Sequence, residues 1–239
     1  MKYSIASVSW GKDSLAMLYG LIDRSMPLDE VVFYDTGMEF TAIYRERDRA
    51  LPMLAEHGIK YTELHPREPF LYNMFVRPVR SRKTGEIHTY GYGWCGGVCR
   101  WGTSEKTATI DRHAKKSAAS VQYVGIAADE TERLSKKSHE RIVHPLSGWG
   151  MTEAECLASC YQHGHTWEQD GVRLYDVLDR VSCWCCRNKN QRELRGIHDF
   201  LPEYWARLLA LENKLGQMKR GKTLEEIGKE CDARRAMGR

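Results

Sequence analysis

Six residues near the N-terminus have the types and spacing needed to bind a phosphate group. The stretch Ser9-Trp10-Gly11-Lys12-Asp13-Ser14 follows a β-like run and precedes a segment with helical apolar periodicity. A strand, a tight polar turn and a helix would direct backbone N–H groups and a helix N-terminus at an anion. A glycine, a lysine charge, a first-turn carboxylate and two hydroxyl groups complete such a site. The predicted binding residues are Ser9, Gly11, Lys12, Asp13 and Ser14.

Eight cysteines offer a second kind of chemistry. In a chain expected to be cytosolic, they favour metal or redox chemistry over disulfides. Two close pairs, Cys95-x3-Cys99 and Cys183-x2-Cys186, are separated by a long interval. If the pairs converge, they supply four thiolates for Zn²⁺ or for an iron–sulfur cluster, and both remain open on spacing alone. Cys185 could replace either neighbour, although the wider Cys183/Cys186 pair is geometrically easier.

Alternating strands and helices must position these residues. The pattern predicts strands at 3–8, 31–34, 59–64 and 121–126, and helices at 13–24, 41–57 and 103–116. This order predicts an α/β fold with a doubly wound, mostly parallel, Rossmann-like sheet. Asp35-Thr36-Gly37 follows the second strand, at the carboxyl edge where such sheets bind ligands.

The rest of the chain differs in character. Residues 65–94 combine prolines, arginines and a Gly-aromatic run, which predicts a long irregular segment that either closes over a substrate or forms a surface insertion. Capping-box patterns begin helices at Thr152 and Thr223. Cys156 and Cys160 share one helix face and are expected to be buried, inert thiols. We expect a nucleotide-binding core at 1–150 and a C-terminal helical region at 151–239, packed on the core, with the second cysteine pair.

Composition narrows the functional classes. The chain has 239 residues and a net charge of +4, which fits a phosphate-rich ligand and permits a nucleic acid partner without requiring one. No apolar run approaches a membrane span, and residues 1–25 lack a signal-peptide pattern. We therefore expect a cytoplasmic protein with no membrane partner.

Several ordered motifs resemble the PP-loop superfamily, and in particular the phosphoadenosine phosphosulfate (PAPS) reductase family. Ser9–Ser14 resembles its Ser-Gly-Gly-Lys-Asp-Ser signature, and Asp35-Thr36-Gly37 follows the second strand as in that family. The stretch beginning Gly125-Ile126 resembles Gly-Ile-Arg-Ala-Asp/Glu-Glu, and His144–Trp149 resembles Pro-Leu-x-x-Trp. The resemblance implies an adenine nucleotide alpha-hydrolase-type fold that binds PAPS, APS or ATP with Mg²⁺. It adds Asp35, Thr36, Gly37, Gly125 and Glu130 to the nucleotide-binding residues.

The chain departs from this family at three positions. Trp10 stands where the family usually has its first glycine, and its Cβ makes a positive φ costly. Ala127 stands where many members have an arginine that helps to hold the anionic substrate, unless Arg133 or Arg100 substitutes for it. Cys231 shares only Glu-Cys with the family's Glu-Cys-Gly-Leu-His segment. It is a candidate catalytic thiol if nearby Lys and Arg residues lower its pKa.

The resemblance leaves three functions open. In sulfonucleotide reduction, the main interpretation, the loop holds the nucleotide, a cysteine takes the sulfonate and a thioredoxin-like electron donor releases sulfite. In the first alternative, an ATP-dependent sulfurtransferase adenylates a nucleic acid base, and Lys12 stabilises the departing pyrophosphate. The second alternative is a non-catalytic nucleotide or redox sensor with structural zinc. One family branch binds a 4Fe–4S cluster through Cys-Cys and Cys-x-x-Cys, which favours a cluster on Cys95, Cys99, Cys183 and Cys186 over zinc.

Overall fold

The structure is a computed structural model that describes residues 3–136 and 139–238. The chain divides into two compact units. Unit 1 contains Met1–Asp35, Thr41–His65 and Glu105–Trp167, and unit 2 contains Thr36–Phe40, Pro66–Ser104 and Glu168–Arg239. The sequence suggested a single domain boundary near residue 150. In the structure, the chain passes from one unit to the other several times. We describe each unit by itself.

Unit 1 is built on a five-stranded sheet in which every neighbouring pair of strands is parallel. The strands are β1 (Tyr3–Ser7), β2 (Glu30–Tyr34), β3 (Lys60–Leu64), β6 (Ala119–Val124) and β7 (Ile142–Val143). Their order is β3-β2-β1-β6-β7, so the predicted doubly wound α/β fold is confirmed. The sequence did not predict β7, because a strand of two residues is too short to show a periodic pattern.

The direction in which the sheet grows reverses between β1 and β6. From β1 the chain adds β2 and β3 on one side, and it then crosses to add β6 and β7 on the other. Open α/β sheets bind ligands outside the carboxyl ends of strands at such a switch point. The loops that follow β1 and β6 begin near Val8 and Gly125, so both predicted nucleotide-binding motifs start at this point.

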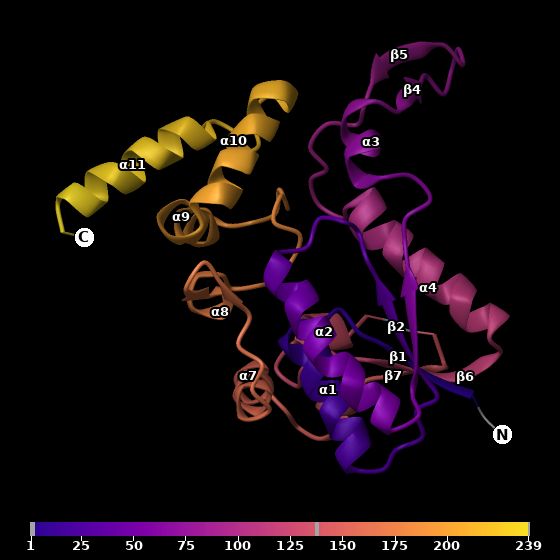
Figure 1. The fold of residues 1–239 in the computed structure, drawn as a ribbon. Coiled ribbons are helices and arrows are strands. Elements are labelled where there is room, and N and C mark those ends of the chain that lie inside the picture. The colour runs from indigo at the N-terminus through magenta and orange to yellow at the C-terminus, as the bar shows by residue number, and fades with distance from the viewer. Residues whose placement is uncertain (1–2, 137–138, 239) are drawn as a thin grey trace. The chain divides into compact units, whose positions relative to one another are not determined.

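Helices cover the two faces of this sheet (Figure 1). The long ones are α1 (Lys12–Asp23), α2 (Thr41–Glu56) and α4 (Glu105–Lys116). Helix α4 buries Ile110 and Ala114 against Ile5, Val32 and Tyr34 of the sheet. All five residues of β2 are buried, as expected for a parallel strand covered on both faces.

Shorter helices complete unit 1: α5 (Thr131–Leu134), α6 (Pro145–Gly148) and α7 (Glu153–Gln162). The predicted capping box of α7 is confirmed, since Thr152 and Glu155 satisfy each other's backbone N–H groups. Cys156 and Cys160 are buried on this helix, as predicted. Burial raises the pKa of Cys156 to about 12, so this thiol stays protonated at neutral pH.

Unit 2 is mainly helical. Its elements are α3 (Phe70–Phe75), the hairpin β4 (Pro78–Arg80) and β5 (Ile87–Tyr90), a π-helical turn (Arg100–Ser104), the hairpin β8 (Glu168–Gln169) and β9 (Val172–Arg173), α8 (Leu174–Val177), α9 (Gln191–Phe200), α10 (Pro202–Leu215) and α11 (Leu224–Ala236). The prediction that residues 65–94 are irregular is therefore wrong in part. The strand β5 is exposed along its whole length, so it lacks the apolar alternation that reveals a strand. None of the described helices has both the length and the apolar character that crossing a membrane requires.

A fully buried carboxylate anchors the start of β2. Glu30 contacts the Tyr3 hydroxyl at 3.2 Å, Lys60 Nζ at 2.8 Å and His113 Nε2 at 3.0 Å. Burial alone would raise the pKa of Glu30, but hydrogen bonds from its neighbours outweigh burial and hold the pKa below its usual value. The stability from Glu30 is therefore present above its unfolded-state pKa and is lost as the pH falls through its folded-state pKa.

We expect Glu30→Gln to lower the free energy of unfolding by about 3 kcal/mol at neutral pH, because it removes the charge that buried donors face. Urea unfolding measures this difference. Glu56→Gln, at the exposed end of α2, is the control and should change stability by less than about 0.5 kcal/mol. The deficit of Glu30→Gln should shrink in acid, and a deficit that stays constant down to about pH 3 would contradict the role of this charge.

Candidate functional site

The first candidate site lies in unit 1, where β1 leads into α1. Gly11 is the N-cap of α1, and no side chain caps the helix there. The Ser14 hydroxyl accepts a hydrogen bond from the Ser9 backbone N–H at 3.1 Å and donates one to the Gly11 carbonyl at 3.0 Å. The two serine side chains also lie 3.2 Å apart. Hydrogen bonds of Ser9 and Ser14 thus fix the conformation of the loop. The helix N-terminus at this loop is a candidate anion-binding site.

Trp10 adopts the conformation for which the family uses glycine. Its φ is +60°, which costs a residue with a Cβ roughly 1–2 kcal/mol. Its indole is fully buried, with ring centroids 6.2 Å from Phe33 and 5.9 Å from Tyr61. Burial of a large aromatic ring outweighs a cost of that size. Trp10 therefore keeps the left-handed turn. Packing of its ring stabilises the conformation that a glycine would adopt through its conformational freedom.

Lys12 is held between two carboxylates. Its Nζ lies 2.7 Å from Asp13 Oδ1 and 2.7 Å from Glu153 Oε1, and its side chain is 8% exposed. Burial alone would lower the pKa of Lys12, but the two carboxylates outweigh burial and raise it above its usual value. Burial raises the pKa of Asp13 despite the adjacent ammonium. Glu153 begins α7, 141 positions along the chain, and no sequence pattern connects it to the loop.

The loop after β6 packs directly on the phosphate loop. A Cβ on Gly125 would lie 3.0 Å from the backbone of Asp13 and of Ser14, so glycine allows this close approach without displacing the loop. Ala127 is fully buried and carries no charge toward a ligand. Glu130 accepts a hydrogen bond from the Ala127 N–H at 3.2 Å and pairs with Arg133 at 2.5 Å.

Many PAPS reductases have an arginine at the position of Ala127. The two arginines considered as substitutes for it, Arg133 and Arg100, both make other contacts in this structure. Arg133 is engaged by Glu130, and Arg100, in unit 2, stacks 5.5 Å from the Tyr92 ring. Asp35, at the end of β2, accepts a hydrogen bond from the Tyr44 hydroxyl at 2.7 Å. Asp35 also has ligand-type atoms within 4.8 Å of those of Glu63 and His65, an association that sequence reasoning missed. The only feature that could have indicated this association is the parallel pairing of β2 with β3, which places the ends of the two strands side by side.

A buried tryptophan supports the phosphate loop from outside. Trp167 Nε1 donates to the Trp10 carbonyl at 2.7 Å, and the Trp167 backbone N–H donates to Glu46 at 2.9 Å. Glu46 also contacts His165 Nδ1 at 2.7 Å, and all four side chains are buried. These contacts hold Trp10 in its left-handed conformation.

We expect Trp167→Phe to destabilise the protein by about 2 kcal/mol and to speed hydrogen exchange at the amides of residues 9–14. The change leaves the buried Trp10 carbonyl without its donor. Exchange measured by mass spectrometry tests this effect. Trp149→Phe, whose ring packs on Gly20 and Arg24, is the control and should leave the loop's exchange unchanged. Equal hydrogen-exchange rates of the loop in wild type and Trp167→Phe would contradict the role of Trp167 in supporting the loop.

The second candidate site lies in unit 2, where the two cysteine pairs come together. Asn188 Nδ2 donates to the Gly97 carbonyl at 2.8 Å, and the Arg187 guanidinium lies against Gly96. The loop that carries Cys95 and Cys99 therefore contacts the segment that carries Cys183, Cys185 and Cys186. The segments that carry the two pairs are thus in contact, and the four-thiolate site itself stays a prediction.

Backbone N–H groups point at the first pair of sulfurs. Arg100 N–H donates to Cys95 Sγ at 3.4 Å, and Gly102 N–H donates to Cys99 Sγ at 3.2 Å. Burial, together with Cys95, raises the pKa of Cys99 to about 11. Hydrogen bonds of this kind stabilise thiolate ligands, whereas burial without a cation keeps a thiol protonated.

Polar side chains lie beside one sulfur of the second pair. The Cys183 thiol lies 3.5 Å from the Thr36 hydroxyl and 3.8 Å from Glu39 Oε1. Burial and Glu39 raise the pKa of Cys183 well above its usual value, and burial also raises that of Cys185. Thr36, predicted as a nucleotide ligand with Gly37, is thus placed beside a cysteine in unit 2. Sequence reasoning missed Glu39 as a neighbour of this site.

A buried lysine accompanies these thiols. Lys189 is 1% exposed, and its Nζ has no hydrogen-bond partner among the described residues. Glu193 Oε1 is 3.9 Å away, which is too far for a hydrogen bond. Burial lowers the pKa of Lys189, whereas thiolates at Cys183, Cys185 and Cys186 would favour its charged form. A buried lysine beside several thiols, with its closest carboxylate oxygen 3.9 Å away, favours a site that carries negative charge when loaded.

Cys231 is placed differently from the expected nucleophile. It is buried in the middle of α11, and burial with Asp199 raises its pKa, although Arg195 and Arg234 oppose this. The expectation that basic neighbours give a lowered pKa is therefore wrong, because desolvation outweighs them. Attack on a sulfonate requires a reactive thiolate, which these surroundings disfavour.

Comparison with known proteins gives a similarity in fold to solved structures. No family model and no curated protein matches this chain. A solved structure that it resembles is the U34-tRNA thiolase NcsA from Methanococcus maripaludis with its [4Fe-4S] cluster. The TM-score is 0.47 at 15% sequence identity, covering 97% of this chain and 71% of that one. A similarity of this size carries no conclusion about activity.

Proposed function

We propose that this chain is an ATP-dependent sulfurtransferase of the PP-loop type, which adenylates a base in a nucleic acid and replaces the activated oxygen with sulfur. The observation that carries this proposal is the buried ammonium of Lys12 beside an uncapped helix N-terminus. A fixed positive charge at a helix N-terminus is what a departing pyrophosphate needs.

Two observations favour this function over sulfonucleotide reduction. The position of the substrate-holding arginine is the buried Ala127, and the C-terminal Cys231 is a buried thiol with a raised pKa. Adenylation requires neither group. Sulfonucleotide reduction therefore ranks second, and we assign Cys231 no catalytic role.

The reaction consists of two balanced displacements. The acceptor oxygen attacks the α-phosphorus of ATP, the α–β phosphoanhydride bond breaks, and pyrophosphate leaves with the bond's electron pair. A sulfide-level sulfur donor then attacks the activated carbon, the carbon–oxygen bond breaks and AMP leaves, with no net oxidation. In this scheme Lys12 neutralises the charge that develops on pyrophosphate, and the serines and Gly11 shape the loop.

We assign nucleotide binding in unit 1 to the loop residues Ser9, Gly11, Lys12, Asp13 and Ser14, with Asp35, Gly125 and Glu130 after the neighbouring strands. Asp13 and Glu153 are carboxylates of the kind that Mg²⁺ prefers, and a metal–nucleotide complex would compete with Lys12 for them. Thr36 and Gly37 stay a prediction from the motif.

We propose that Cys95, Cys99, Cys183 and Cys186 hold a 4Fe–4S cluster. The donor set is all thiol, two N–H groups point at sulfurs, and the buried Lys189 lies nearby without a hydrogen-bond partner among the described residues. A zinc tetrahedron with 2.3 Å bonds needs sulfurs about 3.8 Å apart. Among the described residues, the groups of three or more ligand atoms within 4.8 Å of one another do not include these cysteines. The four thiols therefore do not form a closed zinc site here, and we favour a cluster, which when bound would hold or activate sulfur.

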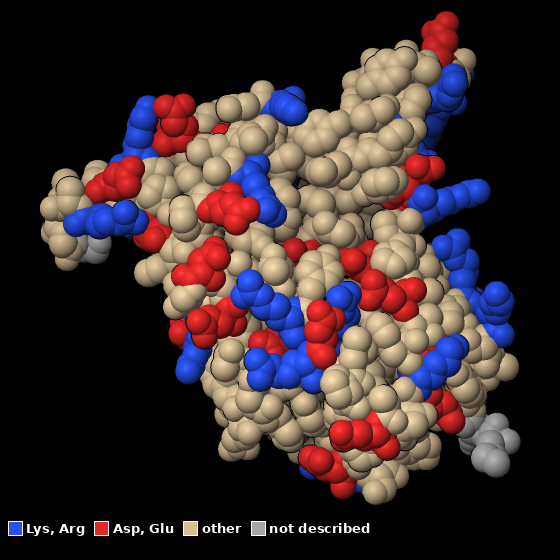
Figure 2. Space-filling model, viewed as in Figure 1, with Lys and Arg blue, Asp and Glu red and all other residues tan. Residues whose placement is uncertain are grey.

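A nucleic acid substrate is supported by the hairpin of β4 and β5. Tyr90 is 64% exposed, and the Tyr92 ring lies 6.0 Å from Arg77 and 5.5 Å from Arg100. Figure 2 shows basic side chains at this hairpin together with an acidic side chain at its outer end. Exposed aromatic rings beside arginines suit base stacking and phosphate contacts.

Pyrophosphate release tests this function. Anaerobically purified protein, ATP and Mg²⁺ are incubated with and without added RNA or DNA. Release that depends on the nucleic acid supports adenylation. Sulfite formation from PAPS with thioredoxin, without pyrophosphate release, would establish reduction instead. ATP binding without turnover for any acceptor would favour a sensor.

A further inference from the structure

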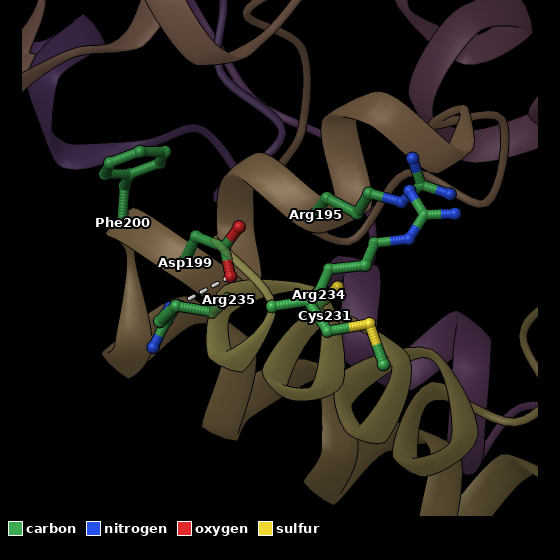
Figure 3. Close-up of a pocket in the computed structure, with 7 residues that line it drawn as sticks. Arg195, Asp199, Phe200, Cys231, Arg234 and Arg235 are labelled. Carbon is green, nitrogen blue, oxygen red and sulfur yellow. Dashed lines mark hydrogen bonds and ion pairs between the residues drawn. The ribbon is translucent and has the colours of Figure 1, made fainter. Parts of the chain in front are cut away.

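Helices α9 and α11 of unit 2 enclose a pocket that the proposed function does not use (Figure 3). Its volume is about 460 Å³, within the range of small-molecule sites. The lining residues are Arg195, Asp199, Phe200, Cys231, Arg234, Arg235 and Met237.

The pocket has an excess of positive charge. Arg195 and Arg234 both line the pocket, and in Figure 3 their side chains run to the same side. Arg195 donates to the Gln191 amide at 3.5 Å, and neither arginine has a carboxylate partner within ion-pair distance among the described residues. The lining carboxylate, Asp199, is already engaged by Arg235 at 2.7 Å. Two guanidinium groups that line one pocket without a carboxylate partner favour the binding of an anion there.

The rest of the pocket is apolar. Phe200 and Met237 are 49% and 71% exposed, and the Cys231 thiol is buried. Exposed large apolar side chains beside an anion site mark the place of an apolar ligand group. The volume also exceeds what a lone inorganic anion would fill.

A metal ion is the competing occupant. His198, Asp199 and Cys231 have ligand atoms within 4.8 Å of one another, which could suit a divalent ion. Asp199 Oδ1, however, already accepts from both His198 Nδ1 and Arg235, each at 2.7 Å. Three guanidinium groups line the same pocket and repel a cation. The charge therefore favours an anion.

We propose that this pocket binds a phosphomonoester of a small aromatic molecule. Arg195 and Arg234 hold the phosphate, because planar guanidinium groups match its oxygens in bidentate geometry. Phe200 and Met237 contact the aromatic body of the ligand. The lining residues of this pocket include none of the phosphate-loop residues, and the inference does not depend on the proposed reaction.

Calorimetric titration of the full chain with phenyl phosphate tests this site. Removing both arginines in R195Q/R234Q should weaken binding at least tenfold for each arginine. R195K/R234K keeps the charges without the planar fork and should bind with intermediate affinity. Arg192→Gln, on the same helix but already paired with Asp179, is the matched control and should bind as wild type does.

Three results would overturn the proposal. Equal affinity of wild type and R195Q/R234Q would remove the arginines from the site. Loss of binding in Lys12→Ala would show that phenyl phosphate occupies the phosphate loop instead. An equivalent of bound zinc that is lost in His198→Ala and kept in R195Q/R234Q would identify a cation site. Phenol should not bind, because it lacks the phosphate that the arginines hold.

Discussion

Replacing Lys12 with alanine should weaken ATP binding by about 100-fold. A charged hydrogen bond to a phosphate contributes up to about 3 kcal/mol, which corresponds to roughly that factor. The substitution also leaves Asp13 and Glu153 without the ammonium that lies 2.7 Å from each, so both carboxylates would repel the phosphates. Equilibrium binding of a fluorescent ATP analogue measures the effect.

Two variants make this test specific. Lys116→Ala, at the exposed end of α4, removes a lysine far along the sequence from the loop and should leave affinity unchanged. Glu153→Gln frees Lys12 from one of its two carboxylates and should preserve or increase affinity for metal-free ATP. Unchanged ATP affinity in Lys12→Ala would contradict the assignment of this loop as the phosphate-binding site.

The pH dependence has a defined sign. The two carboxylates raise the pKa of Lys12 above its usual value, so its positive charge persists through neutral and mildly alkaline pH. The contribution of Lys12 to binding should therefore be constant between about pH 6 and pH 9 and decline only at higher pH. A decline in ATP affinity centred near neutral pH would indicate that a titratable group other than Lys12 controls binding.

The second large effect concerns the cysteines. Anaerobically purified wild-type protein should be brown, with about four irons and matching sulfide, whereas Cys183→Ser should lose nearly all of both. Each ligand is required because a thiolate is the donor and a serine hydroxyl is a poor one. Iron and sulfide analysis with an absorption spectrum measures this, and a colourless wild-type protein with one zinc would replace the cluster with a structural ion.

Two further cysteines serve as comparisons. Cys156→Ser changes a buried thiol on α7 of unit 1 and should leave the metal content unchanged. Cys185→Ser tests whether the middle cysteine is a ligand, and we expect it to retain the cluster. Full retention in Cys183→Ser would remove that residue from the ligand set.

Metal loading should also depend on pH. Because burial raises the pKa of Cys99 to about 11, this thiol must release a proton when it binds a metal ion. The apparent affinity for a probe such as Zn²⁺ should therefore rise with pH through the neutral range. Affinity that is constant with pH would mean that the thiols are already ionised in the metal-free protein.

Local patterns in the sequence determined much of the fold. Strand and helix periodicity predicted four of the five strands of the parallel sheet and the helices α1, α2 and α4, because each pattern lies within a few turns of chain. The capping boxes at Thr152 and Thr223 were readable for the same reason, and both are present. The two cysteine pairs were also visible, since metal ligands cluster at short spacing.

The tertiary structure alone decided how those residues act. Lys12 is paired with Glu153, and Trp10 is held by Trp167, across intervals of 141 and 157 positions. Contacts over such intervals depend on how elements pack, and a local pattern contains no information about them. Burial likewise set the pKa of Cys231, because desolvation depends on surrounding volume and outweighs the basic residues that are adjacent in sequence.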